Sequence, residues 1–304
     1  MVVDESLKIK NIEAKRTQRI LELGKHSEYR LILNGTPVSK NVLDLWTQME
    51  FLSPKILNMT YNHFKNTYCE YYIRGRLKGL VKKQYNIENL ISLIKPYIFD
   101  CELEIESKKN YHDHTYELID SETYEEIKQK FLGNFDAGID FFALTTRLQE
   151  HYVKGKTELL NRVIKEINEP TIVFVKYLQS IPSGSLAITG DVSVKDRKEV
   201  IDTFKNKSGV LYITYGCGSY RLNLQFCKNI IFAEHCFDYA QRIQSEARIY
   251  RIGQQYDVNY HNLWCNVGLE NLIKSSLNKK SNLLDEVKKE IDKKGNEEGV
   301  LKNL

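Results

Sequence analysis

Four short runs in the second half of the chain decide the fold: TIVFV (residues 171–175), LAIT (186–189), VLYIT (210–214) and NIIFA (229–233). Each run is almost continuously apolar and rich in β-branched or aromatic residues, which is typical of a strand buried on both faces. Amphipathic segments separate the runs, for example the one between Arg197 and Phe204. Apolar strands that alternate with helices predict an α/β fold with a parallel sheet covered on both sides.

Composition limits the class of protein. The chain has 304 residues, 42% apolar and 28% charged, and its formal net charge of +4 permits nucleic-acid binding without arguing for it. This length favours about two domains. No run approaches the roughly 18 apolar residues of a membrane span. The six cysteines are widely scattered, which is typical of reduced thiols. We therefore expect a cytoplasmic protein without a membrane partner, and the many Lys, Asn, Ile and Tyr residues suggest a bacterium or a phage as its source.

The rest of the chain has other patterns. YRLILN (residues 29–34) predicts a buried strand, and residues 41–51 have the apolar spacing of a helix. Residues 55–165 are rich in Tyr, Lys and Glu and are mostly helical in period. The segment from Leu272 onward predicts an amphipathic helix with a frayed end.

Short motifs occur near the start of the chain. VDESLKIKN (residues 3–11) is followed by LNGTP (33–37), by Leu45-Trp46 and by FLSP (51–54). The first stretch resembles the DEAH-type Walker B motif, motif II, of the Swi/Snf-related branch of superfamily 2 helicase-like ATPases. The second stretch resembles motif III of the same family.

Further motifs of that family follow in the second half, in the same order. TYGCGS (residues 214–219) with LNL (222–224) resembles motif V, and QSEARIYRIGQ (244–254) resembles motif VI. Residues 171–176 resemble motif IV, and Gly190, Arg197 and Phe204 match the stretch after it. The resemblance covers nearly the whole chain.

The resemblance implies a fold and a division into domains. It implies an α/β, RecA-like (P-loop NTPase-like) helicase C-terminal lobe with a parallel sheet, a helical insertion and a truncated remnant of the first RecA-like lobe. The expected parts are the remnant at residues 1–54, the insertion at 55–165, the second lobe at 166–270 and a C-terminal amphipathic helix and tail at 271–304.

The same resemblance implies roles for individual residues. ATP would lie between the two lobes, with Asp4 holding Mg²⁺ through water and Glu5 acting as the base toward the attacking water. Arg248 and Arg251, expected one turn apart on a helix face, would bring positive charge to the γ-phosphate. The resemblance also implies that Gly218 contacts the nucleotide and that Gln244 contacts the nucleotide or the partner lobe. It implies contacts that couple nucleotide to nucleic acid from Thr36, Thr214, Asn223 and Arg221.

The chain departs from the family at its front. The family's Walker A loop, G-x-x-x-x-G-K-[ST], precedes motif II, and here only three residues precede Asp4. A first lobe with so few strands would expose apolar surface and sheet edges. The GKT at residues 155–157 is not the missing loop, because Glu150 stands at the first glycine and no strand precedes it. Lys156 matches a family lysine that precedes the second lobe, and Thr157 is expected as a helix N-cap.

Two smaller departures are expected to be tolerated because neither is the metal or the base residue, whereas a third departure and one basic cluster remain open. Leu7 replaces the usual His of motif II, and Asn34 replaces Thr or Ser in motif III. Arg221 stands where the family has Gly, and it could add a phosphate contact or damage the coupling loop. The cluster RGRLK (residues 74–78) with Lys82 and Lys83 is either a solvated face or a contact to the DNA backbone.

The leading interpretation is the C-terminal part of an ATP-dependent DNA helicase or translocase of the Swi/Snf type. ATP hydrolysis between two RecA-like lobes would drive movement on DNA, with most contacts to phosphate. Whether this chain alone is an enzyme stays open, because a Walker A half from elsewhere, such as an upstream-encoded chain, is required. The alternative is a non-catalytic DNA- or protein-binding module, or a relic, left by loss of that half.

Overall fold

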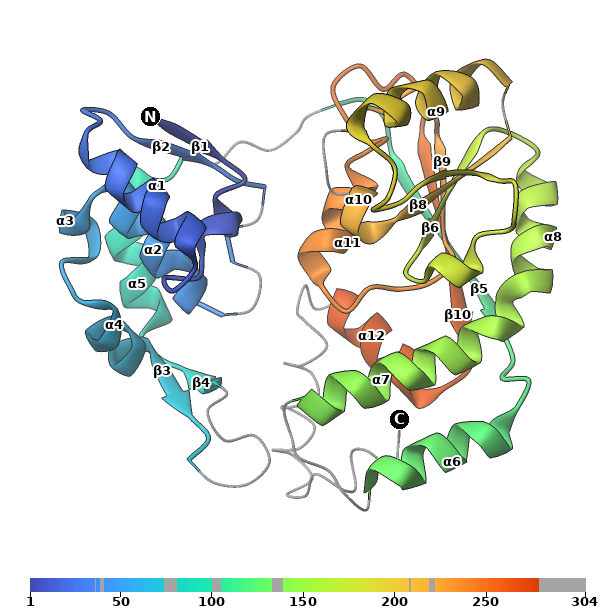
Figure 1. Ribbon diagram of the computed structural model, residues 1–304, viewed down its shortest axis with the longest axis horizontal. Coiled ribbons are helices and arrows are strands. Elements are labelled where there is room, and N and C mark those ends of the chain that lie inside the picture. The colour runs from blue at the N-terminus through green and yellow to red at the C-terminus, as the bar shows by residue number, and fades with distance from the viewer. Residues whose placement is uncertain are drawn as a thin grey trace. The chain divides into compact units, whose positions relative to one another are not determined.

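The computed structural model describes residues 1–35, 37–38, 41–73, 81–99, 105–132, 139–207, 209–218 and 222–278. The chain divides into two compact units, residues 1–102 and residues 103–304, and each is described by itself (Figure 1). The boundary between the two units at residue 102 falls inside the segment 55–165.

Unit 1 begins with a strand and continues mainly as short helices. Its elements are β1 (Val2–Asp4), the 3₁₀ helix η1 (Ser6–Ile9), α1 (Lys15–Lys25), β2 (Leu31–Leu33), α2 (Leu43–Leu52), α3 (Pro54–Leu57), α4 (Tyr61–Tyr68), β3 (Cys69–Tyr71), β4 (Val81–Gln84), α5 (Ile87–Ile94) and η2 (Lys95–Tyr97). The helix predicted over residues 41–51 is present as α2, with Leu45 and Trp46 in the core.

The sheet at the front of unit 1 has two parallel strands. β1 pairs with β2 in the register Val2↔Leu31, Val3↔Ile32 and Asp4↔Leu33. Val3 faces a small core with Ile9 and Phe51, whereas Val2, Leu31 and Leu33 remain 59%, 51% and 47% exposed. The strand predicted at residues 29–34 exists, but it is not buried, because only one face of this short sheet is covered. Exposed apolar surface was the expectation for a first lobe with few strands.

Unit 2 is an α/β layer structure. Its elements are β5 (Lys109–Tyr116), α6 (Ser121–Leu132), α7 (Ile139–Tyr152), η3 (Val153–Lys156), α8 (Thr157–Ile167), β6 (Thr171–Val175), η4 (Leu178–Ser180), β7 (Leu186–Ile188), α9 (Val194–Lys207), β8 (Val210–Thr214), α10 (Tyr215–Gly218), β9 (Asn229–Phe232), α11 (Tyr239–Glu246), β10 (Val258–Cys265) and α12 (Gly268–Asn278). The four predicted strands are all present, as β6, β7, β8 and β9.

The six strands of unit 2 form one parallel sheet in the order β5-β10-β9-β6-β8-β7. Every residue of the central strand β6 is buried, which requires cover on both faces. Figure 1 shows α8 on one side of the sheet and α11 on the other. The α/β class with a parallel sheet is therefore confirmed. All six strands run in the same direction, so their carboxyl ends meet at one edge of the sheet.

The remaining segments combine helices with short strands. Besides its helices, the stretch 55–165 contains the antiparallel hairpin of β3 and β4 and the strand β5, which joins the sheet of unit 2. β5 reads KNYHDHTY because it is an edge strand with most side chains at least partly exposed, so it lacks an apolar signal. Helix α12 begins at Gly268, before the expected boundary at residue 271, and the rest of the expected tail helix lies outside the described residues. Within the described part of the chain, no helix has the length and apolar character needed to cross a membrane.

Candidate functional site

The acidic pair of motif II lies where a parallel strand ends. Asp4 is the last residue of β1 and is exposed, and Glu5 follows it, half-buried, as the residue that caps η1. The backbone of Glu5 has φ 55° and ψ 52°, the left-handed region that non-glycine residues rarely occupy. Such conformations are held by their surroundings and gather at functional sites.

Hydrogen bonds join this acidic turn to motif III. The Ser6 hydroxyl donates to Gln48 Oε1 at 2.6 Å, and Asn34 Nδ2 donates to Ser6 Oγ at 2.9 Å and to Gln48 Oε1 at 3.0 Å. Motifs II and III are therefore neighbours in unit 1. Thr36, the residue of motif III with an expected coupling role, lies outside the described residues.

Motif V begins at the carboxyl edge of the sheet in unit 2. Thr214 is the last residue of β8 and is half-buried, and Gly218 ends the short helix α10 that follows. The Tyr215 hydroxyl between them donates to the backbone oxygen of Glu234 at 2.7 Å, which ties α10 to the end of β9. Asn223 is exposed, and Arg221 lies outside the described residues.

The two arginines of motif VI do not lie on a helix. Helix α11 contains Gln244 but ends at Glu246, and Arg248 and Arg251 follow in a series of turns. Arg248 is 6% exposed, and Arg251 is half-buried with Nη1 donating to the backbone oxygen of Leu222 at 3.3 Å. The expectation of a shared helix face is therefore wrong, although the arginines are held next to the motif V segment.

Gln254 fixes this arginine-bearing turn. Its Nε2 lies 3.0–3.2 Å from the backbone oxygens of Gln225, Cys227 and Ile249. Its Oε1 accepts from the amides of the next two residues at 3.0 and 3.1 Å. These hydrogen bonds hold the turns that follow α11. The signature R-I-G-Q indicated a motif, but its spacing did not reveal this role of the glutamine.

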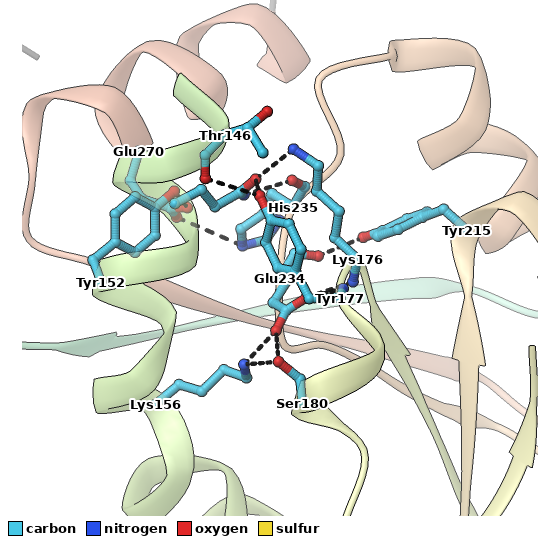
Figure 2. A network of polar contacts seen from close by, with 11 residues as sticks. Thr146, Tyr152, Lys156, Lys176, Tyr177, Ser180, Tyr215, Glu234, His235 and Glu270 are labelled. Carbon is cyan, nitrogen blue, oxygen red and sulfur yellow. Dashed lines mark hydrogen bonds and ion pairs between the residues drawn. The ribbon is translucent and has the colours of Figure 1, made fainter. Parts of the chain in front are cut away.

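A buried polar network lies at the carboxyl edge of the sheet (Figure 2). The carboxylate of Glu234, after β9, accepts from Lys156 Nζ, from the Ser180 hydroxyl, and from the amides of Lys176 and Tyr177 at 2.5 and 2.9 Å. The side chains of Lys156 and Glu234 are only 5% and 0% exposed. The ion pair thus joins the start of α8 to the segment after β9, and the two amides join the same carboxylate to the end of β6.

This network also shows why residues 155–157 are not a phosphate loop. The Lys156 amine is engaged by Glu234 and by the Ser180 hydroxyl at 3.0 Å. Helix α8 begins at Thr157, so Lys156 is the capping residue, and no side-chain cap forms. The expectation that Thr157 is the N-cap is wrong by one position.

Burial shifts the pKa of two ionisable groups near this network. Lys176 donates through Nζ to Gln149 Oε1 at 2.7 Å, and burial lowers the pKa of its amine to about 8. Burial raises the pKa of Glu270 to about 8, so this carboxyl keeps its proton near neutral pH, with the Tyr152 hydroxyl donating to it. Neither residue was singled out from the sequence, because burial at these positions depends on tertiary packing.

Comparisons with known proteins agree with the motifs. Residues 1–161 match the sequence profile of the SNF2-related domain, and residues 155–253 match that of the helicase conserved C-terminal domain. The chain is 26% identical to the SWI/SNF chromatin-remodeling complex subunit snf22 of Schizosaccharomyces pombe, over 85% of this chain and 19% of that protein. It is 23% identical to the ATP-dependent helicase brm of Drosophila melanogaster, over 94% of this chain and 21% of that protein.

Two further similarities cover more of the other protein. The uncharacterized ATP-dependent helicase YqhH of Bacillus subtilis is 23% identical, over 96% of this chain and 60% of that protein. The SWI2/SNF2 ATPase core of Sulfolobus solfataricus, solved in complex with dsDNA, is 23% identical over 99% of this chain and 70% of that chain, with a TM-score of 0.48. The chain thus spans about a fifth of snf22 and brm and 60% of YqhH.

The parallel α/β sheet of unit 2 agrees with the RecA-like class of a helicase C-terminal domain. The SNF2-related profile alone covers more than half of the 304 residues. The chain therefore belongs to the SNF2-related family of Swi/Snf-type helicase-like ATPases.

Proposed function

We propose that this chain is the C-terminal part of an ATP-dependent DNA helicase or translocase that carries motifs II to VI. The observation that supports the proposal most directly is the acidic turn in unit 1. Asp4 ends a parallel strand, and Glu5 follows in a left-handed conformation. An aspartate and a glutamate at such a strand end are the groups that phosphoryl transfer to water requires.

The donor set at Asp4 fits Mg²⁺. This ion prefers oxygen ligands, keeps several waters, and is bound by one or two carboxylates together with the phosphates of a substrate. Asp4 offers one exposed carboxylate, and among the described residues no group of three or more His, Cys, Asp or Glu could hold a metal by itself. That pattern suits an ion held through water and the phosphates of ATP. When bound, Mg²⁺ would neutralise charge on those phosphates.

Each remaining group has a proposed role in hydrolysis. Glu5 orients the attacking water and accepts its proton, and Arg248 and Arg251 supply positive charge toward the γ-phosphate. Gln244 and Gly218 contact the nucleotide. The residues proposed to couple nucleotide to nucleic acid are Thr36, Thr214, Asn223 and Arg221.

DNA is the proposed track. The names of two relatives, the ATP-dependent helicases brm and YqhH, support a nucleic-acid substrate, and snf22 is a chromatin-remodeling subunit. Contacts mainly to the phosphate backbone would make binding weaken as salt rises. The formal net charge of +4 is compatible with such contacts.

The Walker A loop is proposed to lie outside residues 1–304, for example on an upstream-encoded chain. In this scheme residues 1–54 belong to the first RecA-like lobe, 55–165 to the helical insertion, 166–270 to the second lobe and 271–304 to the C-terminal helix and tail. The exposed face of β1 and β2, with Val2, Leu31 and Leu33, offers apolar surface for such a chain. The cytoplasm of a bacterium, or of a host infected by a phage, is the proposed location.

ATP hydrolysis by the purified chain tests the proposal. We expect turnover when duplex DNA and a polypeptide with the Walker A half, for example the N-terminal part of YqhH, are both added. Omitting either component should abolish the turnover. DNA binding that ATP never alters, with no turnover in any mixture, would instead indicate the non-catalytic binding module.

A further inference from the structure

A buried glutamine outside all the motifs lies at the centre of the contacts around the acidic turn. Gln48 is on α2, and its side chain is fully buried, with 0% of the residue exposed. Its Nε2 donates to the backbone oxygens of Pro37 at 2.8 Å and Asp44 at 2.6 Å. Its Oε1 accepts from Ser6 and Asn34, as described above. One amide therefore joins three segments: the turn after β1, the loop after β2 and helix α2.

The chemistry of this position is unusual for a helix core. The neighbours of Gln48 on α2 that are buried include Leu45, Trp46 and Met49, so an apolar side chain would suit the position. A buried amide is costly unless its polar atoms are hydrogen-bonded, and here both the oxygen and the nitrogen have partners. The Ser6 hydroxyl links the acidic turn to Gln48 and to Asn34 of motif III.

The position of Ser6 gives this link a consequence for Glu5. On one side of Glu5, Asp4 is fixed by pairing with Leu33. On the other side, Ser6 is fixed by Gln48 and Asn34. A left-handed conformation at a glutamate is strained and persists only where its surroundings determine it. The two fixed neighbours are such surroundings, and the Lys8 amide, which donates to Glu5 O at 2.9 Å, reports the resulting turn.

We propose that Gln48 is a positioning residue that holds Glu5 in its left-handed conformation through Ser6 and Asn34. The inference rests on the proposed function, because that function assigns Glu5 as the base toward the attacking water. Gln48 is fully buried, and its side-chain oxygen reaches the acidic turn through Ser6 and motif III through Asn34. Its effect is to set the direction of the Glu5 carboxylate and to connect that direction to the loop of motif III.

The first arm of the test needs no ATP hydrolysis. Hydrogen exchange of the full chain is compared between the wild type, Gln48→Leu and Thr47→Val. Thr47 is a matched control, because it is a buried neighbour on α2 whose hydroxyl makes no hydrogen bond in the described structure. We expect exchange at the Lys8 amide to rise at least about tenfold in Gln48→Leu and to stay unchanged in Thr47→Val. Unchanged exchange in both variants overturns the proposal.

The second arm separates positioning from simple stabilisation. The triple variant Ser6→Ala, Asn34→Thr, Gln48→Leu also removes the Ser6 hydroxyl and the Asn34 amide, which lose Gln48 Oε1 as their acceptor in Gln48→Leu, so it should regain part of the melting temperature. In the mixture with DNA and the Walker A polypeptide, we expect both Gln48→Leu and the triple variant to lose at least about tenfold in kcat, with little change in KM. Recovery of kcat together with melting temperature in the triple variant would show a structural role alone. If the wild type itself shows no turnover, the proposed function fails, while the exchange arm still decides the role of Gln48.

Discussion

Replacing Lys156 by methionine leaves the Glu234 carboxylate buried without its cation. Breaking a buried ion pair by removing one partner costs about 3–5 kcal/mol. Glu234 keeps the amides of Lys176 and Tyr177 and the hydroxyl of Ser180, so we take the lower end of that range. For a domain of 150–250 residues, about 3 kcal/mol corresponds to a fall in melting temperature of about 6–12 °C.

The chain offers both a probe and a control for this experiment. A Trp46→Phe background leaves Trp264 as the single tryptophan, and Trp264 lies in unit 2, so its fluorescence follows the unfolding of that unit. Lys154→Met changes an exposed lysine in the same 3₁₀ helix and should alter the melting temperature by less than about 2 °C. The double variant Lys156→Met, Glu234→Gln should regain part of the loss, because the uncompensated charge is gone. Equal melting of Lys156→Met and Lys154→Met would refute the reasoning.

Two other variants test the groups that burial and backbone contacts single out. Burial raises the pKa of Glu270 from 4.5 to about 8, so its contribution to stability is fully present below pH 4.5 and is lost as the pH rises toward 8. Glu270→Gln keeps an acceptor for the Tyr152 hydroxyl and removes the loss of stability at high pH. This variant should melt at the same temperature as the wild type near pH 4 and at least about 5 °C higher than the wild type near pH 8.5. Identical pH profiles of melting would contradict that assignment. Gln254→Met removes the acceptor of the Gln255 and Tyr256 amides, so hydrogen exchange at these two amides should rise at least about tenfold. Hydrogen exchange of the β6 amides should stay unchanged. Protection of the two amides equal to that in the wild type would show that Gln254 does not hold the turn.

The sequence predicted the elements whose residues have an apolar pattern. β6, β8 and β9 are central strands, and β-branched or aromatic residues fill them, so the runs at 171–175, 210–214 and 229–233 were recognisable. β5 and β10 were not predicted. β5 lies at the edge of the sheet with polar residues exposed, and β10 beside it includes Asn259, His261 and Asn262. Strands of this kind give little periodic apolar signal, and their pairing is set by tertiary contacts.

The candidate site was predictable to the extent that motifs are local. Asp4 and Glu5 were found because they are adjacent, but Gln48 lies 42 residues from Ser6, and no local pattern indicates that contact. Lys156 and Glu234 are likewise 78 residues apart. The helix expected to carry Arg248 and Arg251 ends at Glu246, and the Gln254 side chain donates to the Ile249 carbonyl in the turns that follow, a contact that no local pattern indicates.

The central claim of the proposed function is that Glu5 and Arg251 both serve the hydrolysis of ATP. ATP turnover in the presence of DNA and the Walker A polypeptide should therefore be measured for the wild type, Glu5→Gln, Arg251→Ala and the double variant. Residues that act as a unit are strongly non-additive. Each single variant is expected to lose at least about 100-fold in kcat without a change in melting temperature, and the double variant should lose little more than either one. Single variants that keep turnover, or losses that multiply in the double variant, would contradict the claim.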